Sequence, residues 1–279
     1  MKSWLKKVLA VLEVFLVAFV LVPFLTLGIY RLFPRFEAWQ TEALGFPFPV
    51  FVYVVMMGCV LLLILVRRRT LAEYGLAFAN PKVHLDVAAT CFVPVALANM
   101  PLGMGLDHKT WGGAFILAGI QIALLFGLAL LLRKKPSAAL TAGGILLIPT
   151  VIGTGESVAG KALILFLTYA FFVGFGEEIL YRGYMQSRLN EVFGKPYKFF
   201  DVPFGWGALI TALLFGFTHV GILRWMLGLS SEVTLAWGFW TVFSGLVFGF
   251  VREKSGSILA PALLHGLPQA IAVVVMLFL

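Results

Sequence analysis

The chain begins with MKSWLKKVLAVLEVFLVAFV, residues 1–20, in which three lysines precede an apolar run that continues to Tyr30. A helix needs about 20 apolar residues to cross a bilayer, and this run is long enough. Similar runs recur along the 279 residues, of which 61% are hydrophobic and 12% charged. Because the runs are continuous and do not alternate with polar residues, they exclude a β-barrel. The sequence therefore predicts an all-α, polytopic transmembrane helical bundle.

The basic residues predict how these helices are oriented. Lysines precede the first run, while Arg67–Arg69 and Arg133–Lys135 follow the second and fourth, so every second loop is basic. The positive-inside rule places these loops and the N-terminus in the cytoplasm. Nine spans satisfy the rule, or eight if the Gly- and Pro-containing run Ala138–Ile152 is re-entrant. The expected spans are Val8–Tyr30, Phe48–Val66, Leu85–Leu102, Trp111–Leu132, Ala138–Ile152, a helix from near Ala162, Trp206–Leu227, Val233–Val251 and Ile258–Leu279.

Composition also argues against other interpretations. The first run is too long for a signal peptide and lacks a small-residue cleavage site, so we expect it to stay as a span. The net charge of +8 comes largely from residues flanking apolar runs, which indicates orientation and not binding to nucleic acid. Cys59 and Cys91 lie in apolar runs without metal-ligand spacing.

Two adjacent carboxylates and an arginine interrupt the segment GFGEEILYRGYM, residues 174–185. An ionisable side chain near the bilayer centre costs about 2.5 kcal/mol or more, so such residues are candidates for a functional site. Glu178 and Arg182 are four residues apart on one helix face, which predicts an ion pair. Glu177 points about 100° away and can face another neighbour. We expect one structural and one chemical carboxylate, the alternative being that all three lie in water at the helix end.

A histidine follows in FGFTH, residues 215–219, where Phe215 and His219 share a helix face. If the hydrocarbon region begins near Leu209, His219 lies about 15 Å deep, at the rise of 1.5 Å per residue. At that depth it can meet Glu177. A lone histidine in an apolar helix is, however, more often a packing residue.

Another histidine lies in SILAPALLHGLPQAI, residues 257–271, where His265 and Gln269 share a face and Pro268 invites a kink. An imidazole and an amide that project together can donate to a developing oxyanion. They can equally bond to each other or to a neighbouring helix. The pair alone does not decide between these roles.

Other polar motifs are weaker candidates. His84 and His108 lie in predicted loops, where solvated surface is the default. The GLSS turn, residues 228–231, resembles a serine-protease motif of rhomboid type but lacks its second glycine. An HExxH zinc-protease motif is absent from the sequence.

Taken in order, EEILYR, FGFTH and HGLPQ resemble the motifs of the CPBP family, the CAAX-protease and bacteriocin-processing (Abi) intramembrane proteases. That family has EExxxR, FxxxH and HxxxN or HxxxD on successive membrane helices. The resemblance covers about residues 161–279, within a CPBP-like catalytic membrane core that we place at residues 136–279. Residues 1–135 would form four N-terminal membrane helices.

The resemblance implies a role for each motif residue. Glu177 matches the catalytic glutamate, and His219 matches its partner in activating water. His265 matches the histidine that assists at the oxyanion. Gln269 stands where the family has Asn or Asp, so its reach differs by one methylene. The supporting acid and base of the first motif are Glu178 and Arg182.

The resemblance implies an intramembrane endopeptidase that hydrolyses a peptide bond in a membrane-associated or lipidated substrate. We expect it in a prokaryotic plasma membrane, with the lipid bilayer and the substrate as partners and no nucleic acid. We expect no metal cofactor, with zinc held by Glu177, His219 and His265 as the alternative. The departure at Gln269 favours a second hypothesis, a catalytically inactive membrane scaffold or regulator, and transport is a weaker third.

Overall fold

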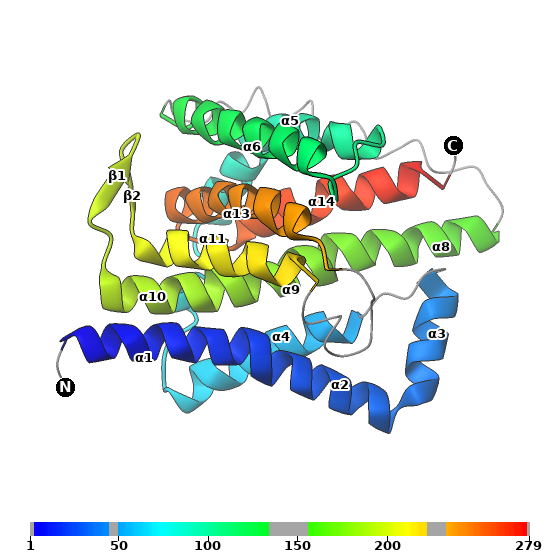
Figure 1. Cartoon of the computed structure of the whole chain (residues 1–279), viewed down its shortest axis with the longest axis horizontal. Coiled ribbons are helices and arrows are strands. Elements are labelled where there is room, and N and C mark those ends of the chain that lie inside the picture. Colours follow the sequence, from blue (N-terminus) through cyan, green and yellow to red (C-terminus); the bar gives the residue numbers. More distant parts are fainter. Residues whose placement is uncertain (1–2, 45–49, 134–155, 222–232, 278–279) are drawn as a thin grey trace.

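The computed structural model describes residues 3–44, 50–133, 156–221 and 233–277, and most of these are helical (Figure 1). Five helices are long and apolar enough to cross a membrane, namely Ser3–Leu32, Pro81–Gly103, Trp111–Leu131, Gly160–Phe193 and Leu235–Ser255. Three shorter apolar helices are Val50–Val66, Trp206–His219 and Leu259–Val275. These helices confirm the predicted all-α membrane bundle. The fifth expected span, Ala138–Ile152, and the GLSS turn lie outside the described residues.

The first span is one continuous apolar helix. It consists of α1 (Ser3–Leu16), the π-helical segment η1 (Val17–Leu21) and α2 (Val22–Leu32). A further helix, α3 (Pro34–Leu44), turns sharply away from α2 within the segment expected to be an outer linker (Figure 1). Helix α4 (Val50–Val66) then packs beside α2 and ends at the arginine triplet.

Helix α5 (Pro81–Gly103) begins four residues before the expected start at Leu85. Proline suits the first helical turn because its missing N–H has no helical acceptor there. His84 therefore lies on the helix, 7% exposed, with Nε2 2.9 Å from the carbonyl oxygen of Ala79. The expectation that His84 is solvated in a loop was wrong. A one-turn helix, η2 (Ala72–Tyr74), precedes α5, and α6 (Trp111–Leu131) follows it.

The polar segment of residues 174–185 lies inside one long helix, here called the motif helix. It comprises α8 (Glu156–Leu167), η5 (Thr168–Val173), α9 (Gly174–Glu178), η6 (Ile179–Met185) and α10 (Gln186–Phe193). The segments η5 and η6 are π-helical and flank the two carboxylates. Such segments are rare and occur frequently at functional sites.

A short hairpin and three helices complete the described chain. Strands β1 (Tyr197–Phe199) and β2 (Val202–Phe204) pair antiparallel, with Tyr197 opposite Phe204. The remaining helices are α11 (Trp206–His219), α13 (Leu235–Ser255) and α14 (Leu259–Val275). Helix α11 was expected to continue to Leu227; it ends at His219, and residues 222–232 lie outside the described part of the chain.

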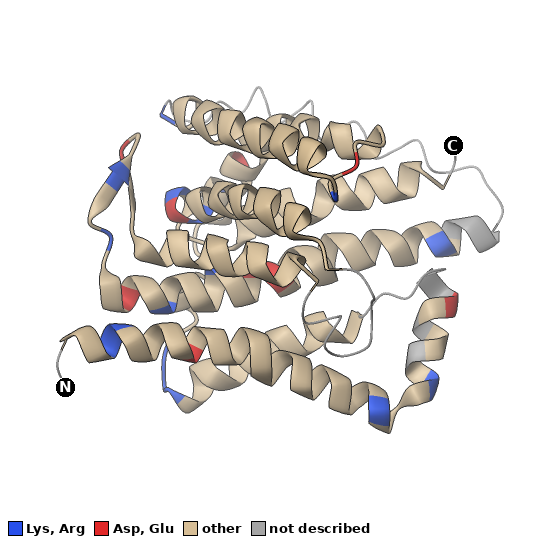
Figure 2. Ribbon diagram, viewed as in Figure 1, with Lys and Arg blue, Asp and Glu red and all other residues tan. Residues whose placement is uncertain are grey.

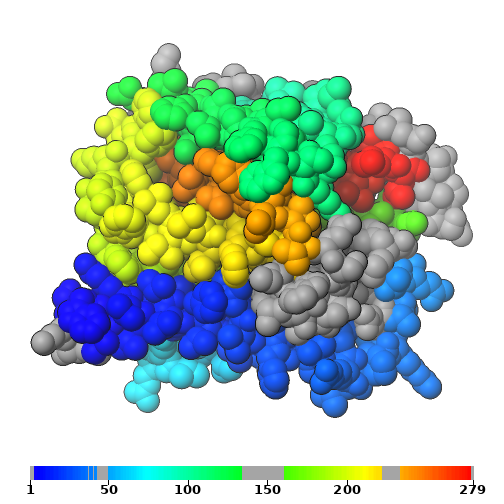
Figure 3. Space-filling model, in the orientation of Figure 1, coloured from blue at the N-terminus to red at the C-terminus, as the bar shows by residue number. Residues whose placement is uncertain are grey.

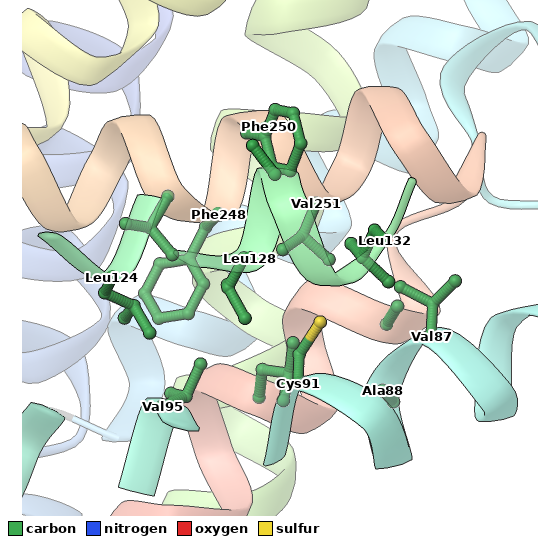
Figure 4. Packing of buried hydrophobic residues seen from close by; sticks show 14 of the residues in the cluster. Val87, Ala88, Cys91, Val95, Leu124, Leu128, Leu132, Phe248, Phe250 and Val251 are labelled. Carbon is green, nitrogen blue, oxygen red and sulfur yellow. The ribbon is translucent and has the colours of Figure 1, made fainter. Parts of the chain in front are cut away.

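Two apolar clusters hold the helices together. One joins α5, α6, α13 and α14 and includes Cys91, Leu128 and Phe248 (Figure 4). The other joins α1, α4, the motif helix and α11 through residues such as Val14, Ile64 and Tyr184. In the space-filling view, α1 and α2 cover one side and α5 and α6 the other, with α11 and α13 between them (Figure 3). The motif helix thus packs against helices from both halves of the chain.

Glycines allow α11 and α13 to cross at close range. A Cβ atom on Gly216 would lie 2.6 Å from the carbonyl oxygen of Gly238, and one on Gly238 would lie 2.8 Å from that of Gly216. Small residues at such crossings are typical of membrane helices, whose packing depends on close van der Waals contact.

Charged residues gather toward the ends of the helices (Figure 2). Many of the basic residues lie at the end that carries the N-terminus, α10, the hairpin and the end of α13 (Figures 1 and 2). The positive-inside rule predicts that this end faces the cytoplasm. Glu177, Glu178 and Arg182 lie in the middle of the motif helix, between the two charged ends.

Candidate active site

The two carboxylates lie where the motif helix closely approaches two of its neighbours. A Cβ atom on Gly174 would lie 2.7 Å from the carbonyl oxygen of Ala262 in α14. A Cβ atom on Gly176 would lie 2.7 Å from the Cβ atom of Tyr53 in α4. These two glycines therefore bring α14 and α4 against the turn that carries Glu177 and Glu178.

Glu178 and Arg182 form a fully buried ion pair. Nη1 of Arg182 donates to Oε1 of Glu178 over 2.8 Å, and both side chains are 0% exposed. Nη2 of Arg182 donates to the carbonyl oxygen of Gly245 in α13, and its guanidinium lies 4.4 Å from the ring centroid of Phe215. A buried pair requires such additional partners to offset the loss of hydration. The alternative, that these residues lie in water at the helix end, is excluded by their burial.

His265 lies between the two carboxylates. Its Nδ1 is 2.9 Å from Oε1 of Glu178, and its Nε2 is 3.8 Å from Oε2 of Glu177. Because that oxygen of Glu178 also accepts from Arg182, we assign the imidazole proton to Nδ1. The ring stacks on Phe248 at 4.8 Å between centroids. The imidazole is thereby fixed with Nε2 facing Glu177.

Glu177 has no cationic partner comparable to Arg182. Its side chain is 11% exposed, and its Oε2 atom is enclosed without a hydrogen bond within the described residues. Tyr53 of α4 packs against the adjacent Gly176, where a Cβ atom would lie 2.7 Å from that of Tyr53. The adjacent glutamates thus occupy different environments, as their angular separation on the helix predicts.

His219 ends α11 beside the same cluster. Its Nδ1 lies 2.8 Å from the carbonyl oxygen of Phe215, which can only accept, so Nδ1 carries the proton. Within the described residues, Nε2 makes no hydrogen bond. The ring lies 4.5 Å from Phe215 and 5.6 Å from Trp237, measured between centroids. Phe215 also lies 6.0 Å from His265, so both imidazoles contact one aromatic ring.

Gln269 lies one turn beyond His265 but is exposed, and no hydrogen bond joins it to a described residue. The intervening Gly266 packs on the backbone of Tyr169 and Ala170, where a Cβ atom would lie 2.7 Å and 2.6 Å from their carbonyl oxygens. The structure therefore brings Glu177, Glu178, Arg182, His219 and His265 together and leaves Gln269 outside their contacts.

The described side chains do not converge as metal ligands do. Nowhere in residues 3–44, 50–133, 156–221 and 233–277 do three His, Cys, Asp or Glu side chains group around a common point. In addition, Nδ1 of His265 is already engaged by Glu178.

Residues 159–271 match the family described as type II CAAX prenyl endopeptidase, Rce1-like. The match agrees with the resemblance of the three motifs to the CPBP family of CAAX proteases. The matched range contains all six residues singled out in the three sequence motifs, namely Glu177, Glu178, Arg182, His219, His265 and Gln269. Helices α1 to α6 lie outside that range. CAAX prenyl endopeptidases are proteases, and with its apolar helices the chain is an integral, multi-pass membrane protein. No curated protein and no solved structure matches the chain.

Sequence motifs did not identify Phe248 or Trp237, whose rings lie against His265 and His219. Each lies on a different helix from the motif residue that it contacts. Within an apolar span, an aromatic residue is ordinarily a packing residue, so the sequence held no signal that would have separated them from the rest.

Proposed function

We propose that the protein is an intramembrane endopeptidase in which Glu177 activates the water that hydrolyses a peptide bond. One observation carries the proposal. The Oε2 atom of Glu177 is enclosed, lacks a hydrogen bond within the described residues, and lies 3.8 Å from Nε2 of a histidine that the Glu178–Arg182 pair holds in place.

Glu177 serves as the general base. It takes one proton from a water molecule as the water oxygen attacks the scissile carbonyl carbon, forming a tetrahedral oxyanion. The same proton then passes to the leaving nitrogen as the C–N bond breaks, which yields a carboxyl and an amino product. The enclosed Oε2 beside Nε2 of His265 favours the first transfer by its position.

The histidines assist from two sides. Nε2 of His265 faces the reacting region and is placed to accept a proton shared with Glu177; the imidazolium so formed can donate to the oxyanion. His219 has its Nδ1 proton committed to the carbonyl of Phe215, so its Nε2 is available as an acceptor for the attacking water. An oxyanion role for Gln269 stays a prediction without a supporting contact.

The substrate is proposed to be a membrane-associated peptide that carries a prenyl group. The family description supports this class. We place the protein in a prokaryotic plasma membrane, with the basic end in the cytoplasm. The reaction is proposed to need no metal ion.

The test uses the purified chain in liposomes with fluorogenic peptides that end in a CAAX sequence, prenylated or unmodified. We expect cleavage of the prenylated peptide by the parent and by Glu73→Gln, which alters an exposed glutamate of η2. Glu177→Gln should stay folded and lose cleavage by at least about 10²-fold, within the range for a general base. Equal cleavage by Glu177→Gln would refute the assignment. A parent that cleaves neither peptide, with a cellular phenotype unaffected by Glu177→Gln, would favour the scaffold hypothesis.

A further inference from the structure

A hydrogen bond joins the motif helix to α11 beside His219. The hydroxyl group of Tyr181 in η6 donates to Oγ1 of Thr218 over 3.0 Å. Tyr181 is 2% exposed, and it occupies a position that the pattern EExxxR leaves open. The proposed function gives no role to Tyr181 or to Thr218.

Thr218 extends this bond to the carbonyl group that fixes His219. Its Oγ1 donates over 2.7 Å to the carbonyl oxygen of Phe215, the same oxygen that lies 2.8 Å from Nδ1 of His219. Oγ1 of Thr218 is itself 3.4 Å from that Nδ1 atom. A chain of polar contacts therefore leads from Tyr181 through the last turn of α11 to the imidazole.

The place of the bond relates the position of His219 to that of Glu177. The two helices run antiparallel, with the start of α11 beside α10 and its end beside η6 (Figure 1). Glu177 lies four residues before Tyr181, and His219 lies one residue after Thr218. Because the helices are antiparallel, both side chains lie in the same direction from the bond. The bond therefore limits how far α11 can slide relative to Glu177.

We propose that Tyr181 and Thr218 are positioning residues for His219. Their hydrogen bond holds the last turn of α11 in the register that directs Nε2 of His219 to the water that Glu177 activates. This inference rests on the proposed function of Glu177 and His219. Both positioning residues act through the imidazole and not on the reacting atoms.

The physical basis is that apolar contacts fix the register of membrane helices weakly. Lipid tails are as apolar as the surface of a neighbouring helix, so close packing and polar bonds select the register. The ring of Phe215 lies 5.0 Å from that of Tyr181 and 4.5 Å from that of His219, measured between centroids. Such ring contacts tolerate sliding, whereas a hydrogen bond needs its two atoms within a narrow range of distance and angle.

The first test compares cleavage by the parent, Tyr181→Phe and Thr218→Ser. Phenylalanine keeps the ring and removes the donor, whereas serine keeps the hydroxyl group. We expect kcat of Tyr181→Phe to fall about tenfold with KM nearly unchanged, because a misplaced histidine affects the transition state more than substrate binding. Thr218→Ser should cleave like the parent. A raised KM with unchanged kcat in Tyr181→Phe would indicate a substrate contact and contradict the positioning role.

The control for this test is Tyr74→Phe. Tyr74 is also buried, but it stacks on Tyr184 near the basic end of the bundle. This variant should match the parent in kcat and KM. An equal loss of kcat in Tyr74→Phe and Tyr181→Phe would mean that any buried phenol has this effect, and would refute the proposed link.

A double variant shows whether the two residues act through one bond. Thr218→Val removes the hydroxyl group and keeps the shape, and adding Tyr181→Phe to it should lower kcat no further. Thr90→Val is the control, because Oγ1 of Thr90 also donates to a carbonyl of its own helix, that of Asp86, over 2.7 Å. It should leave kcat unchanged. Losses that add in the double variant would refute the shared bond.

NMR of protein labelled with nitrogen-15 in its histidines separates this inference from the proposed function. The imidazole signals that are lost in His219→Asn belong to His219, and they should shift in Tyr181→Phe but not in Tyr74→Phe. Shifted signals, with a parent that cleaves no peptide, would support the positioning bond and refute the protease function. Unshifted signals refute the positioning role; the function then stands if the parent cleaves and falls with it if the parent does not.

Discussion

The Nδ1 atom of His265 lies 2.9 Å from Oε1 of Glu178, the same oxygen that accepts a hydrogen bond from Arg182 at 2.8 Å. One carboxylate therefore orients the imidazole and neutralises the arginine at once. Its neighbour Glu177 is left with an enclosed oxygen that faces the other nitrogen of the same ring. Two adjacent glutamates thus have separate tasks because their partners differ.

Arg182→Ala should prevent most of the protein from folding. The change leaves Glu178, which is 0% exposed, without its cation, and breaking a buried pair in this way costs about 3–5 kcal/mol. The measurement is the folded yield after size exclusion in detergent. Arg133→Ala is the control, since Arg133 is 55% exposed and 3.7 Å from Asp201. A folded and fully active Arg182→Ala protein would contradict the buried pair.

Chelation should leave peptide cleavage unchanged. His265 already uses Nδ1 for Glu178, and in the described part of the chain no three potential ligands converge. The measurement combines metal analysis of the purified protein with activity after treatment with a strong zinc chelator. Stoichiometric zinc, together with activity that chelation abolishes and zinc restores, would establish the metalloprotease alternative.

Gln269→Ala should change the single-turnover rate by less than about threefold, because the side chain is exposed and has no hydrogen bond to a described residue. An amide that donates to the oxyanion would instead lose about 10²-fold or more in kcat. Gln269→Asn, which restores the family residue, is the companion variant. A large loss in the alanine variant, recovered in the asparagine variant, would show that Gln269 reaches the oxyanion when substrate is bound.

The sequence predicted the helices well because the bilayer sets their length. The apolar runs Val8–Tyr30 and Trp111–Leu132 lie within or nearly coincide with the observed helices. The start of α5 was missed by four residues because Pro81 was taken as a turn signal and not as a first-turn residue. The division at residue 135 stays a prediction.

The site was predictable only in part. Helical spacing was enough to predict that Glu178 pairs with Arg182. It also predicted that Glu177 faces a different neighbour. It could not show that His265, rather than His219, faces Glu177 most closely, since that depends on how α14 packs on the motif helix. It also places Gln269 on the helix face of His265, and the structure shows that side chain exposed one turn beyond the buried imidazole.

Thermal stability should fall as the pH drops below about 6.5, the usual histidine value. His108, in the loop between α5 and α6, packs edge-on against Trp237, and burial lowers its pKa, with smaller effects from Asp107, Lys109 and His219. The unfolded chain then binds more protons, so the contribution of His108 is complete above that pH and is lost below it. The midpoint of unfolding at pH values of about 8 and 5.5 should differ less in His108→Asn. An equal difference in both proteins would exclude His108 as a source.

The central claim is that Glu177 activates water and does not itself attack the substrate. A single turnover in water enriched in oxygen-18, followed by mass spectrometry of the product and of the enzyme, distinguishes the two. We predict one labelled oxygen in the new carboxyl group of the product and none in Glu177. Label in the Glu177 side chain with an unlabelled product would show a covalent intermediate and contradict the account, as would complete cleavage by Glu177→Gln.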